Sequence, residues 1–186
     1  MTRDVLLTMA LLVTAVSARA QPSLAPTPEL LAQAIADGYR ENSDALNKHC
    51  DRGLCVMTPY VRVAEWARAA LRDLRPRPAV ADVPPEMVTD YAIVTVDPYA
   101  YSRCTPSRLM VVPATASRKQ KVEGSRDLET FKEPVSFSNK MGGTWESYRL
   151  VAKVPLAEIS PSLAFMATFD QTCVPQERKV PMKGVW

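Results

Sequence analysis

The sequence predicts an α+β domain, with two N-terminal helices packed on a mainly antiparallel sheet or a small β-sandwich. Three observations lead to this fold class. Apolar residues recur at helical spacing in two segments before residue 75, strand-like segments fill the chain from about residue 91, and short turns join several of these strands. Helices followed by a run of strands in hairpin order are typical of an α+β domain.

The first helix is expected to begin after Thr27, which is followed by a proline and a glutamate. A threonine side chain can cap the free amides of a helix start, proline is tolerated at the first helical position, and glutamate favours the positive end of the helix dipole. The apolar stripe of this helix consists of Leu31, Ala34, Ile35 and Tyr39.

The second helix repeats the same capping chemistry at Thr58-Pro59 and is expected to run from about Pro59 to Leu74. Its apolar positions, at offsets of three and four residues, are Val63, Trp66, Ala67, Ala70, Leu71 and Leu74. This pattern predicts that Trp66 is buried at the centre of the helix. Pro76 and Pro78 end it, because each disfavours helical geometry in the residue before it.

Strands are predicted in the C-terminal half. Residues 91–96 are apolar on both faces, which predicts a strand covered on two sides, and residues 109–112 form a shorter one. Residues 114–133 are polar and are interpreted as a surface loop. A hairpin is expected from residues 135–137 and 145–154 around a Gly-Gly turn. Residues 163–169 and 178–182 complete the set, with one helical turn within 155–160.

The first twenty residues have the three parts of an export signal. Arg3 precedes an apolar run from Val5 to Val16, and Ala18 and Ala20 supply the small-residue pattern that a signal peptidase cuts, which places the cut before Gln21. The run is too short to span a bilayer, and no later apolar run is long enough. We therefore expect a signal peptide (1–20), a short leader (21–26) and one globular domain (27–186), located in the periplasm or outside the cell.

The four cysteines are Cys50, Cys55, Cys104 and Cys173. In an oxidising compartment an even number of cysteines predicts disulfides, and three pairings are possible. We favour Cys50 with Cys55, since Gly53 lets the short gap turn back, and Cys104 with Cys173 by elimination.

The segment from Thr58 to Ala64, Thr-Pro-Tyr-Val-Arg-Val-Ala, resembles a group of exported bacterial proteins that carry no assigned activity. These proteins share a signal peptide, an N-terminal helical region with such a segment and a strand-rich C-terminal half. The corresponding tail here lies at residues 154–156, 165–169 and 180–185. The resemblance implies location and architecture, and it supplies no catalytic or binding residue.

No constellation of residues predicts a cofactor or a metal. His49, beside Cys50, is the only histidine, and we interpret it as an exposed residue of a disulfide loop and not as a zinc ligand, because a second pair of ligands with zinc-like spacing is missing. Nucleophilic catalysis has no other imidazole as base, and no nucleophile elbow follows Gly124. Asp37 and Glu41 could share a helix face, but two solvated carboxylates do not separate their pKa values.

The most prominent charged feature is an arginine face on and after the second helix. Its members are Arg62, Arg68, Arg72 and Arg75, with Arg77 beyond them. Such a face could bind an anionic envelope component or an acidic protein, or it could be a solvated helix face whose arginine stems cover apolar surface. Nucleic acid is not expected as a partner, because removal of the signal lowers the formal net charge only from +3 to +2.

The predicted function is therefore that of a non-enzymatic exported domain that binds a partner or supports the cell envelope. Two alternatives stay open. One is an envelope hydrolase whose site is assembled from residues distant in sequence, and the other is a thiol redox protein that uses Cys50 and Cys55.

Overall fold

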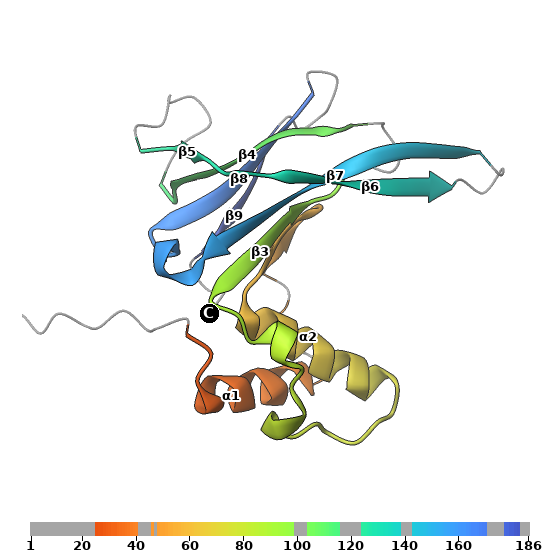
Figure 1. The fold of residues 1–186 in the computed structure, drawn as a ribbon, viewed down its shortest axis with the longest axis vertical. Helices are drawn as coiled ribbons and strands as arrows, with labels where there is room; N and C mark the ends of the chain where they lie inside the picture. The colour runs from red at the N-terminus through yellow and green to blue at the C-terminus, as the bar shows by residue number, and fades with distance from the viewer. Residues whose placement is uncertain are drawn as a thin grey trace, which may run out of the picture.

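The structure is a computed structural model that describes residues 25–40, 46, 48–98, 104–115, 124–138, 143–170 and 177–182. Two helices and two antiparallel sheets make up this part of the chain, which confirms the α+β prediction (Figure 1). The elements are α1 (Pro28–Gly38), β1 (Cys50–Asp51), β2 (Leu54–Met57), α2 (Pro59–Arg72), β3 (Tyr91–Val96), β4 (Pro106–Pro113), β5 (Arg126–Asp127), β6 (Phe131–Ser138), β7 (Thr144–Pro155), β8 (Leu163–Phe169) and β9 (Glu177–Pro181), with 3-10 turns at Val80–Asp82, Pro85–Met87 and Leu156–Glu158.

Both helices begin where the capping residues predicted. The side-chain oxygen of Thr27 accepts a hydrogen bond from the amide of Leu30, and Thr58 accepts one from Val61, at 3.3 Å in each case. Helix α2 ends at Arg72, and Leu74 beyond it is almost fully exposed. Trp66 is only half-buried, so the prediction that the helix buries it was wrong: the buried face of α2 is turned toward Val63 and Ala67 instead.

The two helices pack closely on each other because small residues meet at their crossing. A methyl group added at Gly38 of α1 would overlap the backbone of Ala64 in α2, so only glycine allows this approach. The helices touch the five-stranded sheet mainly through β2, and they lie together at one end of the molecule (Figure 1). They therefore extend the core at one end of the larger sheet.

The larger sheet has the strand order β1-β2-β3-β7-β6, and the smaller one has the order β5-β4-β8-β9. Every strand pair is antiparallel. Strands β1 and β2 form a hairpin whose turn residues, Arg52 and Gly53, have φ values of 44° and 96°, as a type I′ turn requires. From the sequence pattern this hairpin was expected to be a loop, and β5 and the start of β6 were expected to lie in a surface loop.

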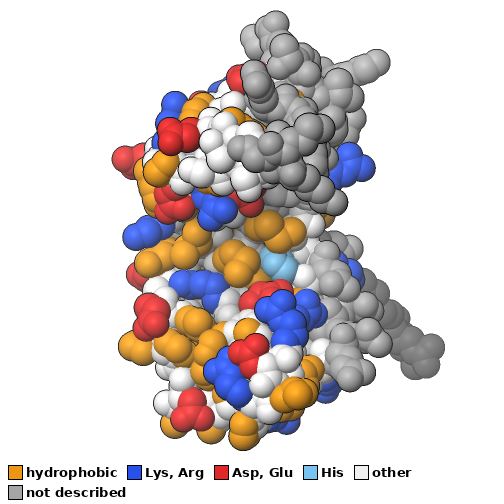
Figure 2. Space-filling view, turned by 90° about the vertical axis from the view of Figure 1, so that its right-hand side faces the viewer, with side chains coloured by type: hydrophobic (Ala, Val, Ile, Leu, Met, Phe, Trp, Pro, Cys, Tyr) orange, Lys and Arg blue, Asp and Glu red, His pale blue; other side chains and the backbone are white. Residues whose placement is uncertain are grey.

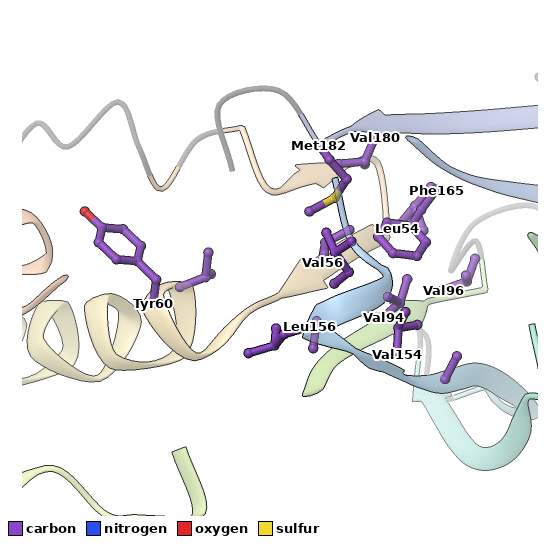
Figure 3. Close-up of a cluster of buried hydrophobic side chains, with 14 of the residues drawn as sticks. Leu54, Val56, Tyr60, Val94, Val96, Val154, Leu156, Phe165, Val180 and Met182 are labelled. Atoms are coloured by element: carbon purple, nitrogen blue, oxygen red, sulfur yellow. The ribbon is translucent and has the colours of Figure 1, made fainter. Parts of the chain in front are cut away.

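One hydrophobic core joins both sheets. Val94 and Leu54 from the larger sheet belong to the same cluster as Phe165 and Val180 from the smaller one, and Figure 3 shows these side chains directed toward one another. Strand β3 alternates between fully buried and half-buried residues, so it is covered on one face only. The prediction of two covered faces was wrong, because the outward residues Ile93 and Thr95 are β-branched like the inward ones and the sequence pattern cannot separate them.

None of the helices within the described ranges is long and apolar enough to cross a membrane.

Candidate binding surface

The face of the larger sheet that points away from the core is called the outer face here. On β3 its residues are Tyr91, Ile93 and Thr95, all half-buried, whereas the intervening residues are fully buried. The strand register carries this face onto the neighbouring strands. Its members there are Cys55 and Met57 on β2, Trp145, Ser147, Arg149, Val151 and Lys153 on β7, and Phe131, Glu133, Val135 and Phe137 on β6.

The hairpin of β6 and β7 extends past the rest of its sheet. Strand β3 pairs only with residues 150–155 of β7, so residues 144–149 pair with β6 alone. We call this distal part, residues 133–138 and 144–149, the arm; it projects beyond the sheet in Figure 1. Near its tip the rings of Phe137 and Trp145 stack at a centroid distance of 5.5 Å. The arm thus holds an aromatic pair on a narrow two-stranded ribbon.

A row of charged side chains crosses the outer face at the base of the arm. Arg149 lies between Asp97 and Glu133, with nitrogen–oxygen distances of 2.8 Å and 4.0 Å. Lys153, two residues further along β7, places its ammonium 5.1 Å from the ring centre of Tyr91. The outer face therefore carries two acidic and two basic groups among apolar ones, with no net charge.

The free edge of the sheet at β6 is poorly suited to pairing with another strand. Pro134 stands in the middle of this edge strand and lacks an N–H, and Lys132 and Pro134 are both exposed. Lys132 points to the opposite side of the strand, where its ammonium lies 4.2 Å from the ring centre of Tyr148. A partner is thus expected to bind the face of these strands and not to pair with the edge of β6.

Arg62, the first residue of the predicted arginine face, forms hydrogen bonds within the protein. Its guanidinium donates hydrogen bonds to the carbonyl of Glu86 at 3.1 Å, to the hydroxyl of Thr89 at 2.6 Å and to the carbonyl of Tyr91 at 3.1 Å. It also lies over the ring of Tyr91, 5.7 Å from its centre. Burial lowers the pKa of Arg62 from its ordinary value. Arg62 therefore fastens α2 to the start of β3.

The other arginines of the predicted face lie nearer to solvent. Arg68 forms an ion pair with Glu65 at 3.6 Å, Arg72 is exposed one turn further along α2, and Arg75 pairs with Asp73 at 2.9 Å beyond the helix end. The structure brings Arg68 and Arg72 onto adjacent turns but does not bring Arg62 into their group. An anionic partner for this face stays a prediction.

His49 is buried, which corrects the expectation of an exposed histidine. It precedes β1, where its carbonyl accepts a hydrogen bond from Val56 at 2.8 Å, and only 7% of the residue is exposed. Figure 2 shows the histidine in the waist of the molecule, with hydrophobic side chains above it and charged ones below. Burial lowers its pKa, an effect that Glu65 and the Leu46 backbone oppose and Arg68 reinforces. Its Nδ1 has no hydrogen-bond partner among the described atoms.

The Cys50–Cys55 disulfide is present as predicted. Cys104 is buried and also disulfide-bonded. Cys173 lies outside the described residues, and its pairing with Cys104 stays a prediction. Within the described ranges no group of three or more His, Cys, Asp or Glu residues is arranged to hold a metal ion.

Of the two carboxylates that could share a helix face, Asp37 and Glu41, only Asp37 lies among the described residues. Asp37 accepts a hydrogen bond from the Tyr60 hydroxyl and forms an ion pair with Arg40 at 3.5 Å, and Glu41 lies outside the described residues. Burial and the bond to Asp37 raise the pKa of Tyr60. The Tyr60–Asp37 contact joins α2 to α1 and serves the packing of the helices.

Sequence reasoning missed the outer face as a surface. Phe131 fell in the predicted loop. Val135 and Phe137 were assigned to a hairpin, but the face of the sheet on which they lie was not predicted. The period-two alternation of residues 131, 133, 135 and 137 was the available signal.

Comparison with known proteins gives no relative: no family model matches the chain, and no similar protein is found among the curated proteins or the solved structures. The resemblance based on residues 58–64 therefore stays a prediction.

Proposed function

We propose that this chain is an exported, non-enzymatic binding domain that associates with a second copy of itself through the outer face and the arm. The observation that carries the proposal is the stacked Phe137–Trp145 pair on an arm that extends past its own sheet. Exposed apolar patches rimmed by polar groups mark interaction sites, and aromatic residues and arginine dominate the binding energy of protein interfaces.

The charge pattern of the outer face favours a second copy of this chain as its binding partner. A two-fold interface brings the same patch together twice, so the patch must complement itself. The outer face meets this condition because Asp97 and Glu133 lie beside Arg149 and Lys153, and each sign in one copy can meet the opposite sign in the other. A strongly anionic or cationic partner would meet groups of its own sign at half of these positions.

The size of the face is also compatible with a dimer. The arm, six residues of β7 across two strands, covers roughly 20 Å by 10 Å, and the base, six further residues across four strands, covers roughly 20 Å by 20 Å, which together give about 600 Å² at about 3.3 Å per residue and 4.8 Å per strand. This footprint is of the same order as the ~800 Å² that each partner contributes to a standard interface. We treat the two sheets with their shared core, proposed to be a small β-sandwich, as the rigid body that presents it.

The test is the oligomeric state of the mature protein, measured by native mass spectrometry and by light scattering after size exclusion. The wild-type protein is expected to be dimeric, and Trp145→Ala is expected to weaken the dimer about 30-fold or more, as truncation of an interface hot spot costs about 2 kcal/mol. Ser136→Ala, on the opposite side of the arm and exposed, is the matched control and should leave the dimer intact.

Three outcomes separate the possibilities. A dimer that Trp145→Ala dissociates and Ser136→Ala preserves supports the proposal. A monomer that a photo-crosslinker at position 135 joins to a different protein, in a manner dependent on Trp145, rejects the second copy and retains a binding domain. A monomer without such an adduct rejects the surface. The mass of the exported product tests export separately, since cleavage before Gln21 is expected.

The competing hydrolase class makes a different prediction. Purified protein that hydrolyses one of a broad panel of ester, amide and glycoside substrates, and loses that activity when a single polar residue is changed to alanine, would replace the binding proposal.

A further inference from the structure

The chain contains two kinds of disulfide position. The Cys50–Cys55 bond joins residues that stand directly opposite each other in the β1–β2 hairpin, at the edge of the larger sheet. Cys50 is exposed and Cys55 is half-buried. Cys104 is 3% exposed and belongs to the central hydrophobic cluster, and its disulfide therefore begins inside the core.

The hairpin does not depend on its bridge for its shape. The type I′ turn at Arg52 and Gly53 already reverses the chain, the amide of Asp97 donates to the carbonyl of Gly53 at 2.9 Å, and the amide of Val56 donates to the carbonyl of His49 at 2.8 Å. A disulfide stabilises mainly by closing a loop in the unfolded chain, and the effect grows with loop length. A bridge across six residues therefore contributes less by this route than a bridge that closes a long loop.

We propose that the Cys50–Cys55 bond is a site of thiol–disulfide exchange, reduced by a partner protein that carries a dithiol, while the Cys104 bond is structural. Cys55 belongs to the outer face, whereas Cys50 stands on the edge strand β1 beyond the residues of that face, and the exchange rests on the exposure of Cys50. Exchange requires that a thiolate reach a disulfide sulfur, and the exposed Cys50 supplies that access whereas the buried Cys104 does not.

The exchange transfers two electrons to this chain in two successive thiolate attacks. A thiolate of the partner attacks Sγ of Cys50, the Cys50–Cys55 bond breaks, and its electron pair leaves on Sγ of Cys55, which takes a proton from water. The second thiol of the partner then loses its proton and attacks the partner's own sulfur in the mixed disulfide, which releases Cys50 as a thiolate that is protonated in turn. Two electrons and two protons pass to this chain, and the partner becomes a disulfide.

Reduction would release β1 from its covalent attachment to β2. Strand β1 has only two residues and pairs with β2 alone in its sheet, although it also touches β9 of the smaller sheet. His49 and Asp51 flank Cys50, so the same change loosens the segment that carries the buried histidine. The oxidised and reduced forms are thus expected to differ at this hairpin and to share the same core.

The first experiment treats the folded, fully oxidised mature protein with increasing ratios of reduced to oxidised dithiothreitol, followed by alkylation and peptide mass spectrometry. Cys50 and Cys55 are expected to be labelled together at a ratio at least tenfold lower than the ratio that labels Cys104. Simultaneous labelling of all three cysteines, or labelling of Cys50 and Cys55 only in denaturant, would overturn the proposal.

A second experiment separates an exchange site from a bond that is merely accessible. The probe is a thioredoxin-type protein with a C-x-x-C pair whose resolving cysteine is replaced by serine, so that a mixed disulfide is trapped. An adduct on Cys50 is expected. No adduct, or one on Cys104, contradicts the proposal. The double variant C50S/C55S is the control: it should form no adduct at these positions, keep Cys104 protected and retain the circular dichroism spectrum of the oxidised protein.

Discussion

The two faces of the five-stranded sheet differ although the same strands supply both. The inner face holds residues such as Val94 and Val96, which are completely shielded from water and meet Phe165 of the other sheet. The outer face holds mostly half-buried apolar residues, with Val151 buried and Phe131 exposed, and a row of ion pairs. Alternation along each strand thus separates two tasks, since one set of side chains stabilises the fold and the other remains available for contact with a partner.

The largest expected loss of stability comes from a substitution in the core that the inner face covers. Phe165→Ala removes a buried ring from the shared core and is expected to lower the free energy of unfolding by about 3–5 kcal/mol. Phe131→Ala makes the same chemical change on the outer face, where the side chain is 46% exposed, and should cost less than about 1 kcal/mol. Urea denaturation in a Trp145→Ala background measures both without a contribution from association. Equal losses would show that the faces do not differ.

The second prediction extends the contrast to the helices. Gly38→Ala is expected to destabilise the protein by about 1–3 kcal/mol, because its methyl group must push α1 away from Ala64. In an ordinary helix interior the same substitution stabilises by roughly 0.5–1 kcal/mol. The sign of the change in thermal unfolding therefore decides whether the close helix crossing exists, and Ala32→Gly, at an exposed position of α1, provides the helix-propensity reference.

The third prediction concerns Arg62, the arginine of α2 that binds the start of β3. Arg62→Leu removes the arginine donor from the Thr89 hydroxyl and from the Glu86 carbonyl, and it removes one of the two donors to the Tyr91 carbonyl, at an expected cost of about 1–3 kcal/mol. Arg72→Leu, on the exposed side of the same helix, should change stability by less than about 0.5 kcal/mol. Calorimetry of the two variants distinguishes a fastening arginine from a solvated one; similar values would remove that distinction.

The smallest effect is a pH dependence of stability at His49. Since burial lowers its pKa in the folded state, the unfolded chain binds the proton first as the pH falls. The stabilisation is complete above the ordinary histidine pKa of about 6.5 and declines as the pH falls from there toward the lower folded value. Denaturation of wild type and His49→Gln between pH 8 and pH 5 should show this decline in the wild type alone, while a parallel response in both would assign it to other groups.

The elements that the sequence predicted correctly are those with local signals. Thr27 and Thr58 mark the helix starts through their side chains, and residues 163–169 alternate clearly enough to define a buried strand. The hairpin at Cys50–Cys55 was missed because its strands have two and four residues, too few to show a period, although Arg52-Gly53 between them was a turn signal.

The positions of Arg62 and His49, both expected at the surface, depend on contacts that sequence spacing does not encode. Arg62 has the same helical spacing as a surface arginine, and only the approach of residues 86–91 turns it inward. His49 is buried because the β1–β2 hairpin lies next to α2, whose Glu65 and Arg68 act on its pKa. Both are consequences of tertiary packing, which overrides the local pattern.

Pro134 hinders the edge-to-edge assembly of copies of this protein. Ribbons that join along free strand edges can add copies without end, and the products are fibres. A proline in the middle of β6 interrupts the backbone ladder that such polymerisation requires, so this edge is poorly suited to that mode of growth. A single imino acid in this position thus limits aggregation along the β6 edge and leaves the broad side of the sheet open to contact.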